Sequence, residues 1–145
     1  MQDPAIFAPF FGTMLLTLVV WLYMYARRLT FLFTSDIDHR AIDTRAKAAG
    51  MVPDRISYAS DNLKNLFELP VLFYAVCIYL YLSSSVDTLY LVAAWWFFFF
   101  RIVHSFVHCT CNNVPRRFIA YVISSAGLWL MVVRAAIQGF AQPAG

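Results

Sequence analysis

Charged residues are scarce in this chain: Asp, Glu, Lys and Arg make up 13% of its 145 residues. A soluble domain carries about 25%, so this chain cannot cover a water-facing surface of its size with charge. Apolar residues make up 61%, which is far more than a disordered chain contains and excludes disorder. The net charge is only +3 and the basic residues do not share a soluble face, so nucleic-acid binding is not expected.

Cysteines are also few. The chain has three, all in or beside apolar segments, which excludes a disulfide scaffold. Its length suggests a single domain, residues 1–145. With a mean hydropathy of +0.65, an integral membrane protein is the class that remains. Asp3 stands where a signal peptide has basic residues, so the first apolar stretch is expected to stay as an uncleaved helix.

Four apolar stretches are long enough to cross a hydrocarbon core, which takes about 20 helical residues. They run over residues 5–26, 61–82, 86–109 and 115–136. A closed barrel is excluded because the chain has no series of short alternating strands. The sequence therefore predicts an all-α fold, an integral membrane four-helix bundle with up-down topology.

Basic residues are distributed unequally among the connections. The loop over residues 27–60 contains six, Arg27, Arg28, Arg40, Arg45, Lys47 and Arg55. The second loop, residues 83–87, has none, and the third is followed at once by Arg116 and Arg117. By the positive-inside rule, the first and third loops lie in the cytoplasm and both termini lie outside it. Within the first loop, residues 41–49 have helical composition.

Apart from Arg134, the strongly polar residues in the spans or just beyond their ends lie at one level of the bundle. Because successive helices alternate in direction, this level is the cytoplasmic end of all four. The residues there are Arg27, Arg28, Asn62, Asn65, Glu68, Arg101, His104, His108, Arg117 and Tyr121. Charged groups inside a spanning helix are costly and usually have a partner or a function.

Spacing places the polar residues of each helix on one face, since positions three or four apart are neighbours. The three resulting stripes are Asn65 with Glu68, Arg101 with His104 and His108, and Arg117 with Tyr121. Glu68 and Arg101 are both about 10–12 Å below the expected helix ends. An acid and a base at one depth in low dielectric should pair, so a Glu68–Arg101 ion pair is predicted. Pro70 is expected to kink the second helix just past Glu68.

Three motifs carry a family resemblance: Asn65-x-x-Glu68-x-Pro70, Arg101-x-x-His104-x-x-x-His108 and Arg117-x-x-x-Tyr121. In this order they resemble the MAPEG family, the membrane-associated proteins of eicosanoid and glutathione metabolism. The resemblance covers the whole chain and is of the bacterial type. The step from Arg101 to Arg117 matches prostaglandin E synthase-like members without a gap, and the chain also resembles microsomal glutathione transferase.

The resemblance implies a homotrimer of such bundles, surrounded by membrane lipids in a bacterial inner membrane. Glutathione, the co-substrate, would lie between neighbouring subunits near the cytoplasmic side. Arg117 would face its sulfur. The other binding residues would be Arg28, which meets a carboxylate from the adjacent subunit, Asn65, Glu68, Arg101, which braces Glu68, His104, His108 and Tyr121.

The chemistry of Arg117 suits this role. A free thiol has a pKa near 8.5, and the thiolate is the nucleophile. A guanidinium is always charged, and Arg117 lies just inside a helix N-terminus, whose dipole also favours negative charge. The expected reaction is a glutathione transferase or peroxidase reaction, in which the thiolate attacks a lipophilic small molecule.

Some positions depart from the family pattern. Phe118 follows Arg117 where prostaglandin synthases have a serine, which argues against prostaglandin isomerase activity. Ser57 and Tyr58 stand where a glutamate and an arginine are usual, and Asp61 replaces a basic residue.

Other classes of function remain open. His104, His108, Cys109 and Cys111 read H-x-x-x-H-C-x-C, a set of ligands that could hold zinc or copper. A second alternative is a catalytically silent membrane scaffold or sensor of the same fold. A small proton-coupled exporter using Glu68 is a third, although it leaves the basic cluster unexplained.

Overall fold

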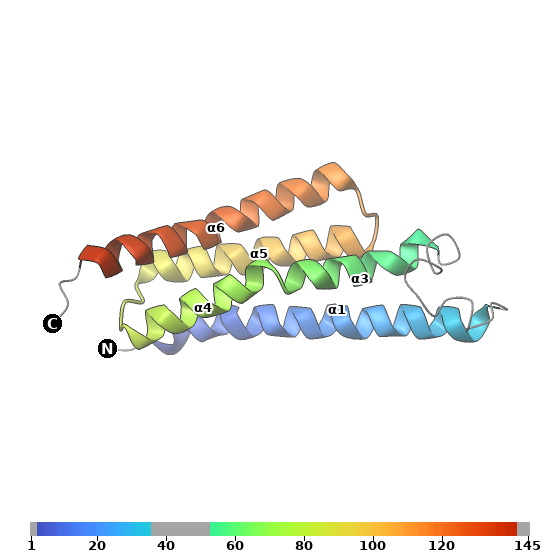
Figure 1. Cartoon of the computed structure of the whole chain (residues 1–145), viewed down its shortest axis with the longest axis horizontal. Coiled ribbons are helices and arrows are strands. Elements are labelled where there is room, and N and C mark those ends of the chain that lie inside the picture. The colour runs from blue at the N-terminus through green and yellow to red at the C-terminus, as the bar shows by residue number, and fades with distance from the viewer. Residues whose placement is uncertain (1–2, 36–52, 142–145) are drawn as a thin grey trace.

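A computed structural model describes residues 3–35 and 53–141, and all regular structure in these two ranges is helical. The elements are η1 (Pro4–Ile6), α1 (Phe7–Thr34), α3 (Asp54–Leu66), α4 (Leu69–Leu82), α5 (Thr88–Cys109) and α6 (Val114–Ala141). They form an up-down bundle in which α3 and α4, placed end to end, make up one of its four long segments (Figure 1). The expected all-α four-helix bundle is confirmed. The helix expected over residues 41–49 lies outside the described residues.

Four helical segments are long and apolar enough to cross a membrane: Pro4–Thr34, Asp54–Leu82, Thr88–Cys109 and Val114–Ala141. Large apolar side chains on α1, including Phe11, Leu15 and Val19, are exposed on the surface of the chain. In a membrane such a surface contacts lipid rather than water. The chain is therefore an integral membrane protein.

The first span is longer than expected. It was predicted to end at Ala26, but α1 continues through both arginines to Thr34 and has 28 residues. Arginine is a good helix former and does not stop a helix. At 1.5 Å per residue α1 is about 42 Å long, which exceeds a hydrocarbon core of about 30 Å. The fourth span, α6, also has 28 residues and extends beyond the expected 115–136.

The second span begins at Asp54, earlier than the expected Asp61, and is broken at Phe67 and Glu68. The break precedes Pro70, which has no N–H to donate to the preceding turn and whose ring collides with it. Proline is tolerated in the first turn of a helix, where it stands in α4. The kink is confirmed, and it lies slightly before the predicted place. The break also leaves carbonyl groups at the end of α3 without helical donors.

Helices α5 and α6 form the most extensive contact between elements. A Cβ added at Gly127 would lie 2.9 Å from the carbonyl oxygen of Ala93, so the two backbones approach closely there. The indole N–H of Trp96 donates to the carbonyl of Ile123 at 2.8 Å. These contacts fix how α5 and α6 face one another.

At one end of this pair, Asp87 accepts hydrogen bonds from the backbone N–H of Tyr90 at 3.0 Å and from Nη1 of Arg134 at 2.8 Å. Nη2 of Arg134 also donates to the Asp87 carboxylate. The Tyr90 hydroxyl donates to Gln138 at 2.7 Å. We call these four residues the α5–α6 clasp. The hydrogen bonds from Arg134 lower the pKa of the Asp87 carboxyl from 3.8 to about 2.

Candidate functional site

At the opposite end of α5 and α6 from the clasp, three helices bring most of the predicted site residues together. We call this group the polar cluster: Asn65 of α3, Arg101, His104 and His108 of α5, and Arg117 and Tyr121 of α6. It lies near the short connection between α5 and α6 (Figure 1). The stripes inferred from spacing on α5 and α6 therefore face one another, and Asn65 of α3 joins them.

His104 contacts the backbone of α6. Its Nδ1 lies 2.9 Å from the carbonyl oxygen of Arg117. Because a carbonyl can only accept, Nδ1 carries the hydrogen and Nε2 is left as an acceptor. Nε2 is buried and has no partner in the described part of the chain. The ring also packs at 5.6 Å between centroids against Tyr121.

Arg117 lies in the first turn of α6, and its side chain turns back toward α5. Nη1 lies 2.8 Å from Nε2 of His108 and also donates to the side-chain oxygen of Asn112. A guanidinium can only donate, so Nε2 of His108 accepts and its Nδ1 carries the hydrogen. His108 is therefore uncharged. Its Nδ1 lies 3.4 Å from the side-chain amide of Asn65. Because Nδ1 carries a hydrogen, the amide must present its oxygen there, which exchanges the positions of its oxygen and nitrogen.

Asn112 is a site residue that sequence reasoning missed. Its φ of 46° lies in the left-handed region, which asparagine tolerates better than most residues. Its backbone N–H donates to the carbonyl of Val107 at 2.8 Å, which closes the end of α5. The asparagine in a short turn was the available signal, but only the fold shows that its side chain reaches Arg117.

Arg101 is fully buried, with an exposed fraction of 0%. Its Nη2 donates to the backbone carbonyl of Asn65, one of those at the end of α3 near the helix break. Its Cζ lies 5.4 Å from the Tyr121 ring centroid and 5.9 Å from that of Phe97. Nε and Nη1 have no hydrogen-bond partner among the described residues. Buried donors without partners are costly, so this position favours a polar ligand.

Two predicted site residues lie outside the polar cluster. Glu68 is exposed at the break between α3 and α4, and the structure shows no ion pair between it and Arg101. The predicted ion pair is therefore wrong for the single chain: Glu68 is exposed, and Arg101 donates to a backbone carbonyl instead. Arg28 is exposed on α1 and makes no hydrogen bond or ion pair with another described residue.

The four residues of the possible metal motif, His104, His108, Cys109 and Cys111, do not converge. The Asn62 amide donates to Cys109 at 3.4 Å, and the exposed Cys111 donates to the Val107 carbonyl at 3.7 Å. Within residues 3–35 and 53–141, no group of three or more His, Cys, Asp or Glu side chains is placed to hold a metal. The described residues therefore give the metal hypothesis no support. A hydrogen bond from the Asn113 backbone lowers the pKa of Cys111.

Two of the positions that depart from the family pattern, Phe118 and Asp61, lie outside the polar cluster. Phe118 is 63% exposed and does not enter the polar cluster. Asp61 forms an exposed ion pair with Lys64, three residues along α3. These residues leave the polar cluster itself intact.

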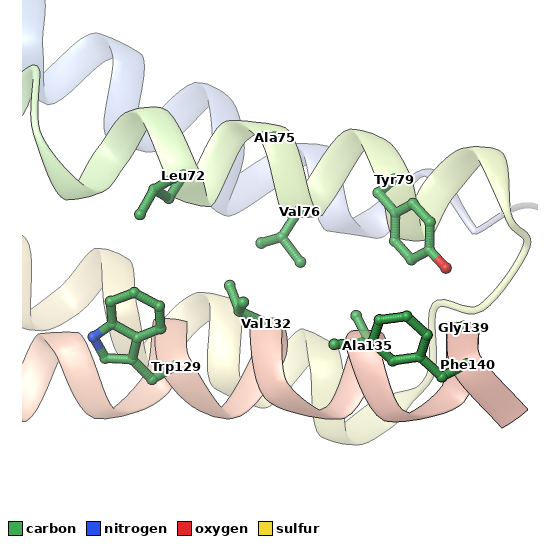
Figure 2. A pocket seen from close by; sticks show the side chains of 10 residues that line it. Leu72, Ala75, Val76, Tyr79, Trp129, Val132, Ala135, Gly139 and Phe140 are labelled. Atoms are coloured by element: carbon green, nitrogen blue, oxygen red, sulfur yellow. The ribbon is translucent and has the colours of Figure 1, made fainter.

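An apolar groove of about 640 Å³ lies between α4 and α6. Figure 2 shows Leu72, Val76 and Tyr79 of α4 facing Trp129 and Val132 of α6 across it. Almost all of its lining is hydrocarbon, so it suits an apolar chain rather than a polar ligand.

Comparison with known proteins agrees with the residue pattern. A model of the MAPEG family matches residues 6–137, a range that includes the whole polar cluster. Comparisons with curated proteins and with solved structures give no match. The match covers most of the chain, and at family level it supports a membrane-associated role in glutathione or eicosanoid metabolism. The chain belongs to the MAPEG family.

Proposed function

We propose that this protein is a membrane-bound glutathione transferase or peroxidase, which activates the glutathione thiol as a thiolate for attack on a lipophilic electrophile. The observation that carries this proposal is the placement of Arg117. Its Nη1 is held by two uncharged acceptors, while Nε and Nη2 have no partner in the described chain. Those two nitrogens can donate to an anion.

The polar cluster has the donors and acceptors that glutathione needs. Glutathione is a tripeptide with two carboxylates, an ammonium group and two amides. Nε and Nη1 of Arg101 are buried donors, and Nε2 of His104 is a buried acceptor, all without partners in the described chain. A bound polar peptide would satisfy both kinds of group and remove the cost of leaving them unpaired.

Arg117 would act on the thiol by electrostatics. The guanidinium and the N-terminal dipole of α6 both favour negative charge at this point. Lowering the pKa of a bound thiol by about one to two units takes about 1.4 kcal/mol for each unit. In a transfer reaction the sulfur then forms a bond to carbon, and the leaving group departs with its electron pair. The protein needs no covalent nucleophile of its own.

We also propose that the working form is a homotrimer in a bacterial inner membrane, with the polar cluster near the cytoplasmic side. Arg28 and Glu68, the two expected glutathione residues outside the cluster, are both exposed on the chain surface. That exposure is what a site shared between neighbouring subunits requires. The excess of basic residues over residues 27–60, between the apolar parts of the first and second spans, supports the orientation.

The adjacent arginines provide the test. Arg116 is exposed and its side chain makes no hydrogen bond or ion pair with a described residue, so it is the matched control for Arg117. Turnover of a reactive aryl halide with glutathione should fall about tenfold or more in Arg117→Ala, which is a loss of at least about 1.4 kcal/mol of transition-state stabilisation. Glutathione affinity, measured by calorimetry, should change little because other groups bind the tripeptide. Arg116→Ala should behave like the wild type.

If wild-type protein neither binds glutathione nor turns over the aryl halide, the enzyme proposal is wrong. The silent scaffold or sensor of the same fold then becomes the better account. Equal losses in Arg117→Ala and Arg116→Ala would remove the specific role of Arg117.

A further inference from the structure

We infer that His108 is a positioning residue: it holds the guanidinium of Arg117 through an uncharged acceptor and leaves the positive charge available to the thiolate. The inference rests on the proposed function. It assigns to the imidazole a task that differs from lining the pocket.

The geometry fixes the imidazole of His108 from both sides. Nε2 accepts from Arg117 at 2.8 Å, and Nδ1 lies 3.4 Å from the Asn65 amide. The ring of His104 packs edge-on at 5.5 Å between centroids. The side chain is 3% exposed, so water cannot replace these contacts. Arg117 is therefore attached to a side chain that cannot rotate freely.

The charge of the holding group decides what Arg117 can do. A carboxylate in the same place would hold the guanidinium equally well, but it would also neutralise it. His108 accepts without a charge, and the second acceptor on Nη1, the side-chain oxygen of Asn112, is also neutral. Besides Arg117, the charged groups with an electrostatic effect on the His108 ring are Arg101 of α5 and Asp61 of α3. No carboxylate in the described chain forms an ion pair with Arg117.

Three substitutions at His108 distinguish holding the Arg117 guanidinium in place from neutralising its charge. His108→Gln keeps an uncharged acceptor at the end of the side chain. His108→Glu keeps the acceptor and adds a negative charge, and His108→Leu removes the acceptor. The measurement is the pH midpoint of thiolate formation on bound glutathione, followed by ultraviolet absorbance with full-length protein in detergent. Glutathione affinity and the unfolding temperature are recorded for each variant.

His108→Gln should titrate close to the wild type. His108→Glu and His108→Leu should raise the midpoint by about one unit or more, which corresponds to about a tenfold loss of thiolate stabilisation. A merely structural role would lower the unfolding temperature without separating Gln from Glu, which have nearly the same shape. If His108→Leu does not fold, the Gln–Glu pair alone decides.

A wild-type midpoint in His108→Glu or in His108→Leu would overturn the inference and leave the proposed function standing. Absence of any thiolate in the wild type would overturn the proposed function, and this inference with it.

Discussion

Nη2 of Arg101, on α5, donates a hydrogen bond to the backbone carbonyl oxygen of Asn65, on α3. That carbonyl is close to the helix break, where the missing N–H of Pro70 prevents a continuous helix. The break in the second span and the buried cation of the polar cluster are thus parts of one arrangement. The arrangement leaves two nitrogens of Arg101 without a partner in the described chain.

Replacing Arg101 should separate stability from binding. A buried charge without an ion-pair partner is costly, and even whole buried ion pairs can often be replaced by apolar residues with a neutral or stabilising effect of about 1–4 kcal/mol. Arg101→Met should therefore unfold, without ligand, at the same temperature as the wild type or higher. Its glutathione affinity should fall about tenfold or more, because the donors that meet the ligand are gone. Calorimetry and thermal unfolding measure the two effects; a strong loss of stability with unchanged affinity would contradict this account.

Gly127 should not accept a side chain. Its Cβ would meet the backbone of Ala93 at 2.9 Å, and a backbone atom cannot move aside without shifting α5. Gly127→Ala should destabilise the protein by about 1–3 kcal/mol. Gly139→Ala is the matched control, because its Cβ would meet only the end of the flexible Tyr79 side chain, at 3.0 Å. Equal unfolding temperatures for the two variants in detergent would show that α5 and α6 do not approach as described.

The contribution of the α5–α6 clasp to the stability of the fold should persist to low pH. Arg134 lowers the pKa of Asp87 in the folded protein, so the contribution of this carboxylate to stability is full above pH 3.8 and is lost only as the pH falls toward about 2. Asp87→Asn should therefore remove part of the dependence of unfolding on pH below about 4 and little above it. The loss at neutral pH should be below about 1 kcal/mol, because the pair is partly exposed. Asp87→Ala also removes the cap on the Tyr90 N–H and should lose about 1 kcal/mol more.

Thiol labelling should report the orientation of the bundle. Cys111 is exposed with a lowered pKa, which makes it the more reactive thiol, whereas Cys77 is buried in the core. A maleimide that cannot cross membranes should label Cys111 in inverted inner-membrane vesicles and fail to do so in intact spheroplasts. Cys111→Ser is the control for specificity. Labelling from the outside would reverse the proposed topology.

Apolar run lengths were enough to predict the number and order of the spans, because hydrocarbon thickness constrains them directly. The ends of the helices were harder to predict. Arg27 and Arg28 mark where the apolar surface ends, but charge does not unwind a helix, and α1 continues to Thr34. The start of α3 at Asp54 could not be predicted from apolar runs because the first turns of α3 are polar.

On α5 and α6, spacing also predicted which helix faces carry the polar cluster, and the contacts of His104 and Tyr121 agree with it. Spacing could not predict which groups the side chains of the polar cluster contact. Arg101 donates to a backbone carbonyl rather than to the side chain of Glu68, and a contact with a backbone carbonyl has no signature in the sequence. The contact of Asn112 with Arg117 depends on one left-handed residue in a tight turn.

We propose that this chain stabilises a glutathione thiolate at Arg117. The most direct measurement is the ultraviolet difference spectrum on adding glutathione to the purified protein at neutral pH. We expect a thiolate band that saturates with glutathione in the wild type and in Arg116→Ala. In Arg117→Ala the band should be strongly reduced although glutathione still binds. Binding without a thiolate band in the wild type, or a band of full size in Arg117→Ala, would contradict it.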